Sequence, residues 1–559
     1  MASSQHDGVH QICDRYVDDI AAADPVTATY VGIAGYDREL PDLSPEGVNA
    51  RARLAAAALA AVAGAEPADP SEANAKAVFG ERVGLQVELH EAGEHLAPLN
   101  VITSAPQEVR QVFDLMPTET TEDWATISAR LAGVPACLSG YRESLRLSAE
   151  RGRVAALRQV TKVAEQCRTW AGLGGTSFFA DLVAPAKVDD ALRSDLEANA
   201  RAAAESYADL AEFLTGELAA KAPTEDAVGE ERYRLWSREF TGARLDLQEA
   251  YEWGWAEHAR LEAEMVEVAG RIKPGATIAE AAAVLDEDPR YRVRGQRALE
   301  EWMQRLSDQA LADLRGVHFE IPDPLMRLEC KIAPPGGGVG AYYTGPTDDW
   351  SRPGRMWWSV PADREDFSTW REVSTVYHEG VPGHHLQIAT AVYQAASLNK
   401  FQRLLTWVPA HGEGWALYAE RLMREFGYLS DDGNLLGMLD AHIFRAARVI
   451  IDIGMHLKLE IPRGTGFHEG ERWTPELGLE FLLTRTITDP AHVHDEIDRY
   501  LGWPGQAPTY KLGERLWLQA RDEAKARRGA DFDLKAFHQD ALVMGAMGLD
   551  TLRERLAAL

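Results

Sequence analysis

The sequence predicts a large, mainly α-helical fold that contains a small β-hairpin or sheet. Between Val188 and Ala269 the chain is rich in Ala, Glu, Leu and Arg, with apolar residues at three- and four-residue spacing, which is typical of amphipathic helices. From Cys330 to Pro361 this period is lost, and Gly, Pro and aromatic residues accumulate, which indicates short strands joined by turns. We therefore expect packed helices with one local interruption by β-structure.

The composition limits the number of domains and the class of partner. At 559 residues the chain exceeds the usual size of one hydrophobic core. We expect a helical region over 1–325, a β-hairpin and edge-strand segment over 326–365, and a second helical region over 366–559 that carries the candidate site. Acidic residues outnumber basic ones by 87 to 58, giving a net charge of −29. Such a charge repels nucleic-acid phosphates and anionic lipid, so we expect neither a nucleic-acid nor a membrane partner.

The cysteines and the N-terminal residues indicate a compartment. The four cysteines include no closely spaced pair, which suits a reducing compartment and excludes a zinc site built from CxxC units. The first twenty residues lack the basic segment and apolar core of a signal peptide. The sequence therefore predicts a cytoplasmic protein.

The β-segment is expected to form strands at 331–332, 341–344 and 356–360. The run 336–341 fits the GxGxxA dinucleotide pattern, but Tyr-Tyr-Thr-Gly-Pro follows it in place of the required helix, so we reject that interpretation. A Gly-rich hairpin beside a cleft fits better. Tyr343 of this hairpin is a candidate substrate contact, because an edge strand can bind an extended peptide. The alternative, that the hairpin covers the core, stays open.

Histidines concentrate near the C-terminal end, where nine of the sixteen lie between His378 and His494. The segment before His378 predicts a helix that opens with a capping box of Thr369 and Glu372. His378 and Glu379 lie at its end. In the zinc-peptidase motif HExxH, two histidines one turn apart bind the metal, and the glutamate between them polarises water.

The second histidine of this segment is displaced, because His384 follows His378 by six residues in place of four. On an unbroken helix this spacing would turn the two side chains away from each other. Pro382 removes a helical hydrogen bond, however, and Gly383 tolerates unusual backbone angles. A break at Pro-Gly would return His384 to the metal, with His385 as the reserve candidate.

A third ligand is needed to complete a zinc site that keeps one position open. Glu413 lies 29 residues beyond His384 and opens a predicted helix. Glu420, seven residues further on, lies on the same helix face, and we assign it to support of a ligand, or to reserve ligand. Each glutamate taken alone could be a solvated surface residue. We therefore expect one Zn²⁺ ion held by His378, His384 and Glu413.

A downstream helix presents a polar stripe. Arg445, Arg448, Asp452 and His456 follow each other in steps of three and four residues, which places them on one face. This stripe could be a buried salt-bridge ladder, or a wall on which an arginine binds a substrate carboxylate. We expect one of these arginines to be structural and the other to lie near the substrate. Arg499 is a further candidate to bind a substrate carboxylate.

A tetrahedral intermediate of amide hydrolysis needs a hydrogen-bond donor for its oxyanion. Tyr510, Tyr500 and His456 are the candidates for this role. For each tyrosine, packing with a satisfied hydroxyl is an equally weighted alternative.

Several segments carry a resemblance to a known family: His378-Glu-Gly-Val-Pro-Gly-His-His385, Glu413-Gly-Trp-Ala-Leu-Tyr-Ala-Glu420, Arg445–His456, Arg499-Tyr-Leu-Gly-Trp-Pro-Gly-Gln506, Asp24-Pro-Val-Thr-Ala-Thr and Leu40-Pro-Asp-Leu-Ser-Pro45. They resemble the domain-of-unknown-function 885 family over nearly the whole chain. The fold of that family resembles the mostly helical thermostable carboxypeptidases, which are zinc enzymes with HExxH and a downstream glutamate ligand. The resemblance implies a metallopeptidase-like fold with a deep cleft, and it places Arg499, Tyr500 and Gln506 among the candidate substrate contacts.

The leading hypothesis is a zinc carboxypeptidase-like enzyme that acts on a peptide, with Glu379 as general base and zinc lowering the pKa of water. A second hypothesis keeps the metal and replaces the peptide by a small non-peptide amide. A third is a non-catalytic helical binding scaffold with a structural metal site. Turnover of peptides against acylated amino acids separates the first two, and zinc binding without turnover of any amide identifies the third.

Overall fold

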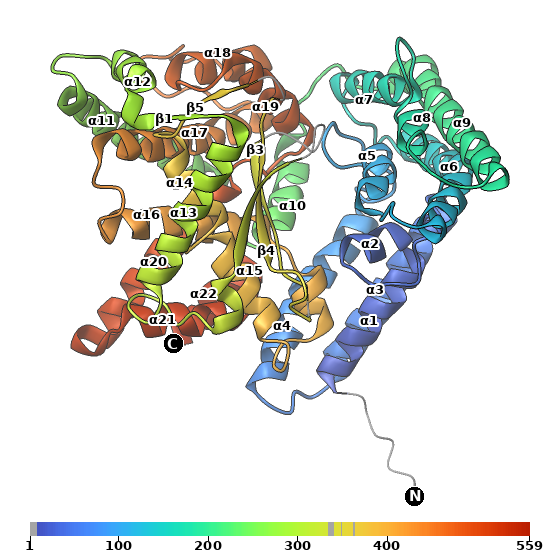
Figure 1. Ribbon diagram of the computed structural model, residues 1–559, viewed down its shortest axis with the longest axis horizontal. Coiled ribbons are helices and arrows are strands. Elements are labelled where there is room, and N and C mark those ends of the chain that lie inside the picture. The colour runs from blue at the N-terminus through green and yellow to red at the C-terminus, as the bar shows by residue number, and fades with distance from the viewer. Residues whose placement is uncertain (1–7, 334–339, 348, 362–363, 559) are drawn as a thin grey trace, which may run out of the picture. The chain divides into compact units, whose positions relative to one another are not determined.

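The structure, a computed structural model, describes residues 8–333, 340–347, 349–361 and 364–558 (Figure 1). The described chain is mainly helical with two small sheets, which confirms that part of the predicted fold class. It packs as two compact units, Met1–Val228 with Asp495–Trp503 and Gly229–His494 with Pro504–Leu559. The boundaries predicted from the sequence lie at residues 325 and 365. The deep cleft stays a prediction.

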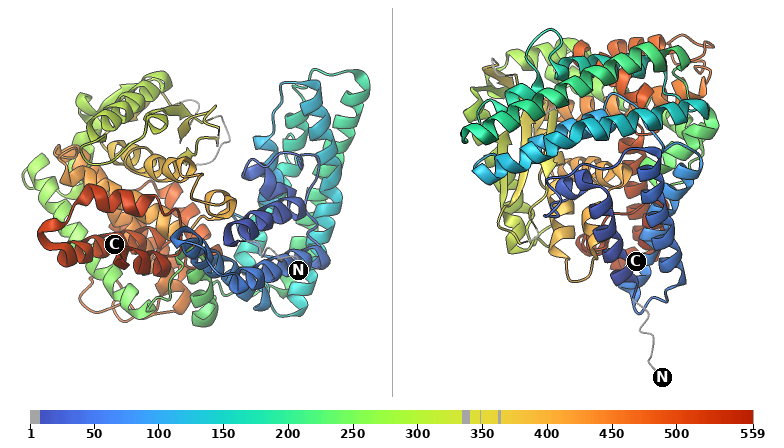
Figure 2. Two further views of the ribbon diagram at one scale, coloured as in Figure 1. Left: turned by 90° about the horizontal axis from the view of Figure 1, so that it is seen from below. Right: turned by 90° about the vertical axis from the view of Figure 1, so that its right-hand side faces the viewer.

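The described residues of the first unit form helices and the segments that connect them, without a strand. Its two longest helices, α6 and α9, lie side by side, and α7 packs along α9 (Figure 2). Helix α6 begins where the Thr120 hydroxyl and the Asp123 carboxylate cap each other's backbone N–H groups. The helices of this unit are α1 (Val9–Ala23), α2 (Pro25–Tyr30), α3 (Pro45–Gly64), α4 (Pro70–Glu91), α5 (Ala105–Gln111), α6 (Thr121–Glu150), α7 (Leu157–Ala171), α8 (Phe178–Val183), α9 (Asp190–Phe213) and the latter part of α19 (Pro490–Gly502).

The second unit contains the remaining helices. They are α10 (Gly229–Thr241), α11 (Leu247–Ile272), α12 (Ile278–Glu287), α13 (Gln296–Leu314), α14 (Glu372–Glu379), α15 (His384–Tyr393), α16 (Pro409–Glu425), α17 (Asp432–Leu457), α18 (Pro475–Arg485), α20 (Thr509–Arg528), α21 (Leu534–Leu542) and α22 (Leu549–Ala558). Among the described residues, no helix of either unit has both the length and the apolar composition needed to cross a lipid bilayer.

Helix α17 forms the centre of the second unit. Nearly every residue between Leu435 and His456 is buried, as expected of a helix that is apolar around most of its circumference. Helix α11 packs along α17, and α16 packs along α20. At the second crossing a Cβ on Gly414 would overlap the backbone of Gly513, so the two helices approach more closely than side chains would allow.

The β-structure of the second unit forms two sheets. Strands β2 (Leu328–Ile332), β4 (Gly354–Ser359) and β3 (Gly340–Thr344) lie in that order, with β2 parallel and β3 antiparallel to β4. Strands β1 (Arg292–Arg294) and β5 (Asp366–Ser368) form an antiparallel pair. The three predicted strands are confirmed, except that Val360 lies outside β4. The Gly-rich run 336–339 lies outside the described residues.

Thr369 and Tyr343 lie in or beside these sheets, and their contacts differ from the predicted ones. Helix α14 begins at Glu372, so the predicted capping box with Thr369 is not formed. The hydroxyl of Tyr343 lies 2.9 Å from Nδ1 of His385, and this contact ties strand β3 to helix α15. Tyr343 therefore has a structural partner on the inner side of the sheet.

Candidate metal centre

The chain breaks between the two histidines of the candidate site. Helix α14 ends at Glu379 and α15 begins at His384, which confirms the predicted break. The Val381–Pro382 peptide bond is cis. A Cβ on Gly383 would overlap the carbonyl oxygen of His378, so only glycine allows the chain to fold back this closely. The Pro-Gly pair thus brings the start of α15 beneath the end of α14.

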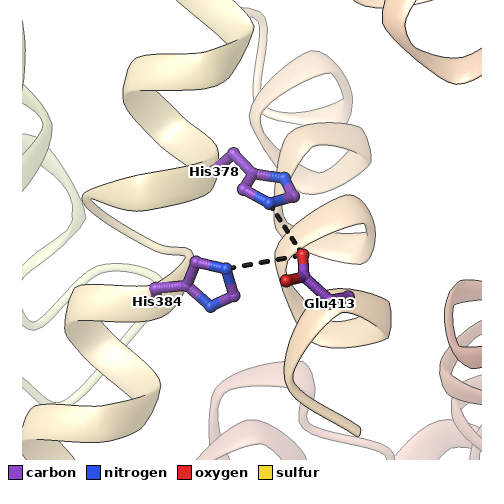
Figure 3. A group of neighbouring side chains, drawn as sticks. All are labelled: His378, His384 and Glu413. Atoms are coloured by element: carbon purple, nitrogen blue, oxygen red, sulfur yellow. Dashed lines mark hydrogen bonds and ion pairs between the residues drawn. The ribbon is translucent and has the colours of Figure 1, made fainter. Parts of the chain in front are cut away.

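The imidazoles of His378 and His384 converge on the carboxylate of Glu413 (Figure 3). Nε2 of His378 lies 3.2 Å, and Nε2 of His384 3.6 Å, from Oε2 of Glu413. One ligand atom from each of the three side chains lies within 4.8 Å of the others. Two atoms that each lie about 2.1 Å from a shared zinc at a tetrahedral angle are separated by about 3.4 Å. The donor set and its spacing therefore fit a tetrahedral zinc site.

A second carboxylate supports the first histidine. Oε1 of Glu420 lies 2.8 Å from Nδ1 of His378, and the Ser374 hydroxyl donates to the other oxygen of Glu420. With Nδ1 engaged as a donor, the neutral imidazole of His378 has its lone pair on Nε2, the atom that faces Glu413 and that would bind a metal. Among the described residues, Glu420 lies outside the group that could hold a metal, and its contact with Nδ1 orients the His378 ring.

His385 is engaged elsewhere. Its Nδ1 lies 2.9 Å from the Tyr343 hydroxyl and its Nε2 lies 2.8 Å from the carbonyl oxygen of Leu325. Burial lowers the pKa of this histidine to about 4. Both ring nitrogens thus hold the neighbouring segments in place, and the structure does not bring His385 into the group.

The charges of the site are mutually stabilised. Burial alone would lower the pKa of His378, but the hydrogen bonds with Glu413 and Glu420 raise it to about 9. Burial also opposes the ionisation of the two glutamates, and their histidine partners overcome it, holding the pKa of both carboxyl groups well below the ordinary range. A cation at this position would replace the proton that His378 carries in the metal-free state.

Glu379 lies directly after the first histidine and is 7% exposed. Burial first, and the charge of Glu413 second, raise the pKa of Glu379 above its ordinary value, against the opposing charges of the two histidines. A buried carboxyl group with a raised pKa next to a candidate metal site is a candidate for accepting and releasing a proton.

A chain of buried charged side chains continues from Glu420 into the interior. Nε2 of His442 lies 3.4 Å from Glu420, and Nδ1 lies 3.6 Å from Glu514. Lys511 and Arg421 both contact Glu514, and both also bind Glu257, at 2.8 Å and 3.0 Å. The supporting carboxylate of the site is thus itself held by an alternating series of acids and bases.

Two arginines of the predicted stripe lie near the ring of Tyr510, and their role as a substrate-binding wall stays a prediction. The guanidinium carbons of Arg445 and Arg448 lie 5.6 Å and 4.7 Å from the centre of the Tyr510 ring. Arg445 is close enough to lower the pKa of Glu379. It donates to the carbonyl oxygen of Ala441 at 3.1 Å, and its buried Nε has no hydrogen-bond partner among the described residues.

The other residues of the predicted stripe have structural contacts. Nε2 of His456 lies 3.9 Å from Asp452, whose carboxylate accepts hydrogen bonds from the Tyr233 hydroxyl at 2.6 Å and from the Gly505 N–H at 2.9 Å. His456 is fully buried and its ring packs against Tyr233. This cluster fastens α17 to α10, and it does not belong to the group around Glu413.

Three further candidates lie near the end of α19. Arg499 donates to Glu496 at 2.9 Å, and the Tyr500 hydroxyl donates to the same carboxylate. Both residues belong to the Asp495–Trp503 segment of the first unit. Gln506 is buried in the second unit, and its carbonyl oxygen accepts from the Thr509 hydroxyl at 2.6 Å. The structure does not place these residues in the group around Glu413.

Two side chains near the site were missed by sequence reasoning. His442 lies three residues before Arg445, so extending the polar stripe by one turn could have found it. Trp407 is exposed beside His384, and an isolated tryptophan in a connecting segment carries no sequence signal of its surroundings.

The fold and site together define a mainly helical protein with a candidate His–His–Glu metal centre. A family model described as "Bacterial protein of unknown function (DUF885)" matches residues 25–556. The chain therefore belongs to the DUF885 family.

Two solved structures are similar to this chain in fold. One is described as "the putative lipoprotein from Colwellia psychrerythraea", with 23% identity, a TM-score of 0.83 and 98% of each chain covered. The other is described as "a putative lipoprotein of unknown function from Shewanella oneidensis", with 18% identity and a TM-score of 0.75, covering 98% of this chain and 99% of that one. A comparison with curated proteins gave no match.

Proposed function

We propose that this protein is a zinc-dependent peptidase of the carboxypeptidase type. The observation that supports the proposal best is the convergence of His378, His384 and Glu413, with Glu379 directly after the first ligand. Two histidines, a carboxylate and an adjacent second glutamate are the donor set of hydrolytic zinc sites, in which the fourth position stays open. A purely structural site would not need the second glutamate.

When bound, zinc would supply a Lewis acid that acidifies water and polarises the carbonyl group of the substrate. Glu379 accepts a proton from the attacking water and delivers it to the amine that leaves. The Tyr510 hydroxyl is the candidate donor to the developing oxyanion. His456 is left out of this role because its contacts fasten two helices together.

The carboxypeptidase assignment is supported by Arg445. Its buried Nε lacks a partner among the described residues, and its charge acts on Glu379. A substrate carboxylate would satisfy this donor in a bidentate pair, and Arg448, which also lies near the Tyr510 ring, is a second cation at this position. A small acylated amino acid carries the same carboxylate, so a non-peptide amide is the second candidate substrate.

The test is the substitution Glu379→Gln. Because the glutamine side chain cannot take up a proton, we expect the variant to bind one zinc per chain by elemental analysis and to lose hydrolysis of a panel of unblocked peptides and acylated amino acids. The same peptides with amidated C-termini test the contact between Arg445 and the substrate carboxylate. If that contact is made, the wild type should hydrolyse the amidated peptides poorly. Full activity of Glu379→Gln would refute the mechanism. Zinc binding by the wild type without turnover of any amide would instead favour a non-catalytic helical binding scaffold with a structural metal site.

The cytoplasmic location also remains a proposal. Two structures of similar fold are described as putative lipoproteins, a description that belongs to those proteins. Fractionation of cells that express the native gene tests this proposal: detection of the chain in the cytoplasmic fraction would support it, and detection in the membrane fraction would contradict it.

A further inference from the structure

Trp407 presents a large apolar surface beside a candidate metal ligand. It lies in the connection between the π-helical turn Phe401–Leu405 and helix α16. The centre of its ring system is 6.0 Å from that of His384. Trp407 is 47% exposed, whereas His384 is 5% exposed. The indole therefore stands at the border between the buried ligand and the solvent.

The packing of the segment fixes this indole in place. The neighbouring residues Thr406 and Val408 are both buried. A Cβ on Gly412 would overlap Cη2 of Trp407, so the indole lies directly on the first turn of α16. The next residue of that turn is Glu413. Trp407 thus contacts the element that carries the third ligand, and it lies beside the second.

An exposed indole held in this way offers a binding surface. Ligand sites combine a few polar groups with aromatic walls, and Trp407 lies next to the polar group formed by His384 and Glu413. Aromatic rings bind other rings and aliphatic chains with favourable geometry beyond simple burial. A substrate whose scissile amide reaches His384 would bring a neighbouring side chain within reach of Trp407.

We infer that Trp407 is the wall of a subsite for an apolar, preferentially aromatic, side chain next to the scissile bond. This inference rests on the proposed function, because it takes the group around Glu413 as the reaction centre. It names the class of substrate: peptides or acylated amino acids with an aromatic or long aliphatic residue at the cleaved bond. It also explains the glycine at position 412, since any side chain there would displace the indole.

The experiment uses zinc-binding probes and does not depend on turnover. Benzohydroxamate and acetohydroxamate both chelate zinc, and they differ by a phenyl against a methyl group. We expect the zinc-loaded wild type to bind benzohydroxamate about tenfold or more tightly than acetohydroxamate by calorimetry. In Trp407→Ala this preference should fall close to unity, with the acetohydroxamate Kd unchanged within about twofold. Trp407→Phe should keep most of the preference.

Two controls separate the possible failures. Trp357→Ala removes an indole that lies on the sheet, where it donates to Thr344 at 2.7 Å and stacks on Tyr342, and this variant should keep the wild-type preference. Equal weakening of both probes in Trp407→Ala, or an undiminished phenyl preference, would overturn the subsite while leaving the metal centre intact. Failure of both probes to bind a wild type incubated with zinc would overturn the metal centre, and the subsite with it.

Discussion

Nδ1 of His378 lies 2.8 Å from Oε1 of Glu420, deep inside the second unit. Both residues are almost fully buried. The same imidazole points Nε2 at Glu413, 3.2 Å away. One histidine therefore lies between two carboxylates, of which one can share a metal with it and the other can only orient it.

Replacing Glu420 should weaken metal binding. In Glu420→Gln the shape is kept and the negative charge is lost, so His378 becomes a poorer ligand. We expect the Kd for zinc, measured by competition with a chelator, to rise about 10- to 100-fold. Glu425→Gln is the matched control, because Glu425 ends the same helix on the surface and pairs with Arg521. A wild-type Kd in Glu420→Gln would show that the contact does not tune the site.

Replacing the buried His442 should also raise the zinc Kd, but by less than replacing Glu420 does. It lies between Glu420 and Glu514, which its removal would leave facing each other in the interior. For His442→Gln we expect a loss of about 1–3 kcal/mol in the free energy of unfolding together with a measurable rise in the zinc Kd.

His538→Gln provides the comparison for His442. His538 is equally buried and contacts the Tyr418 hydroxyl at 2.8 Å, but it makes no contact with Glu420. This variant should unfold at a lower urea concentration than the wild type and should keep the wild-type Kd for zinc. If the two histidine variants changed both quantities alike, the effect of His442 would be one of general stability.

Gly414, the residue after Glu413, should be needed to hold Glu413 at its position beside the two histidines. A Cβ on Gly414 would overlap the backbone of Gly513, so Gly414→Ala must push α16 away from α20. We expect a loss of about 1–3 kcal/mol in unfolding free energy and weaker zinc binding. Gly270→Ala, where a Cβ within α11 meets open space, should instead gain about 0.5–1 kcal/mol. Tight zinc binding by Gly414→Ala would contradict this account.

The local parts of the fold could be predicted from the sequence. Helical periodicity, the three strands of the sheet and the break at Pro382-Gly383 all follow from properties of neighbouring residues. Zinc chemistry restricts ligands to few residue types, which is why His378, His384 and Glu413 could be named as candidate ligands before the structure showed that they converge.

The parts of the site that depend on distant packing could not be predicted. Periodicity put Glu413 and Glu420 on one face, but only the positions of neighbouring helices separate a ligand from a supporting residue. The same holds for His456, which shares a helix face with Arg445 and packs against Tyr233 from another helix. Trp407 and the glycine it covers form a contact that no period in the sequence records.

Glu372 should make the stability of the protein depend on pH. It lines a cavity of about 270 Å³ together with Leu299, Phe367 and other residues of the sheet and of α13 and α14. Burial raises the pKa of its carboxyl group from 4.5 to about 7, although Arg371 and Arg364 oppose the shift. Between these two values the folded state holds more protons at Glu372 than the unfolded state does, so the contribution of Glu372 to the free energy of unfolding falls as pH rises from about 4.5 to about 7.

The substitution Glu372→Gln isolates this contribution, because glutamine stays neutral at every pH. At pH 5 the variant should unfold at nearly the same urea concentration as the wild type, and at pH 8 it should be the more stable of the two. Other groups titrate in the same range, because burial raises the pKa of Asp440 to about 6 and lowers the pKa of His385 and His411 to about 4. The difference between variant and wild type is therefore the quantity that reports on Glu372. Glu287→Gln removes one exposed charge from α12 and controls for net charge. An unchanged difference between pH 5 and pH 8 in Glu372→Gln would show that this carboxyl group ionises in the folded protein as it does in the unfolded chain.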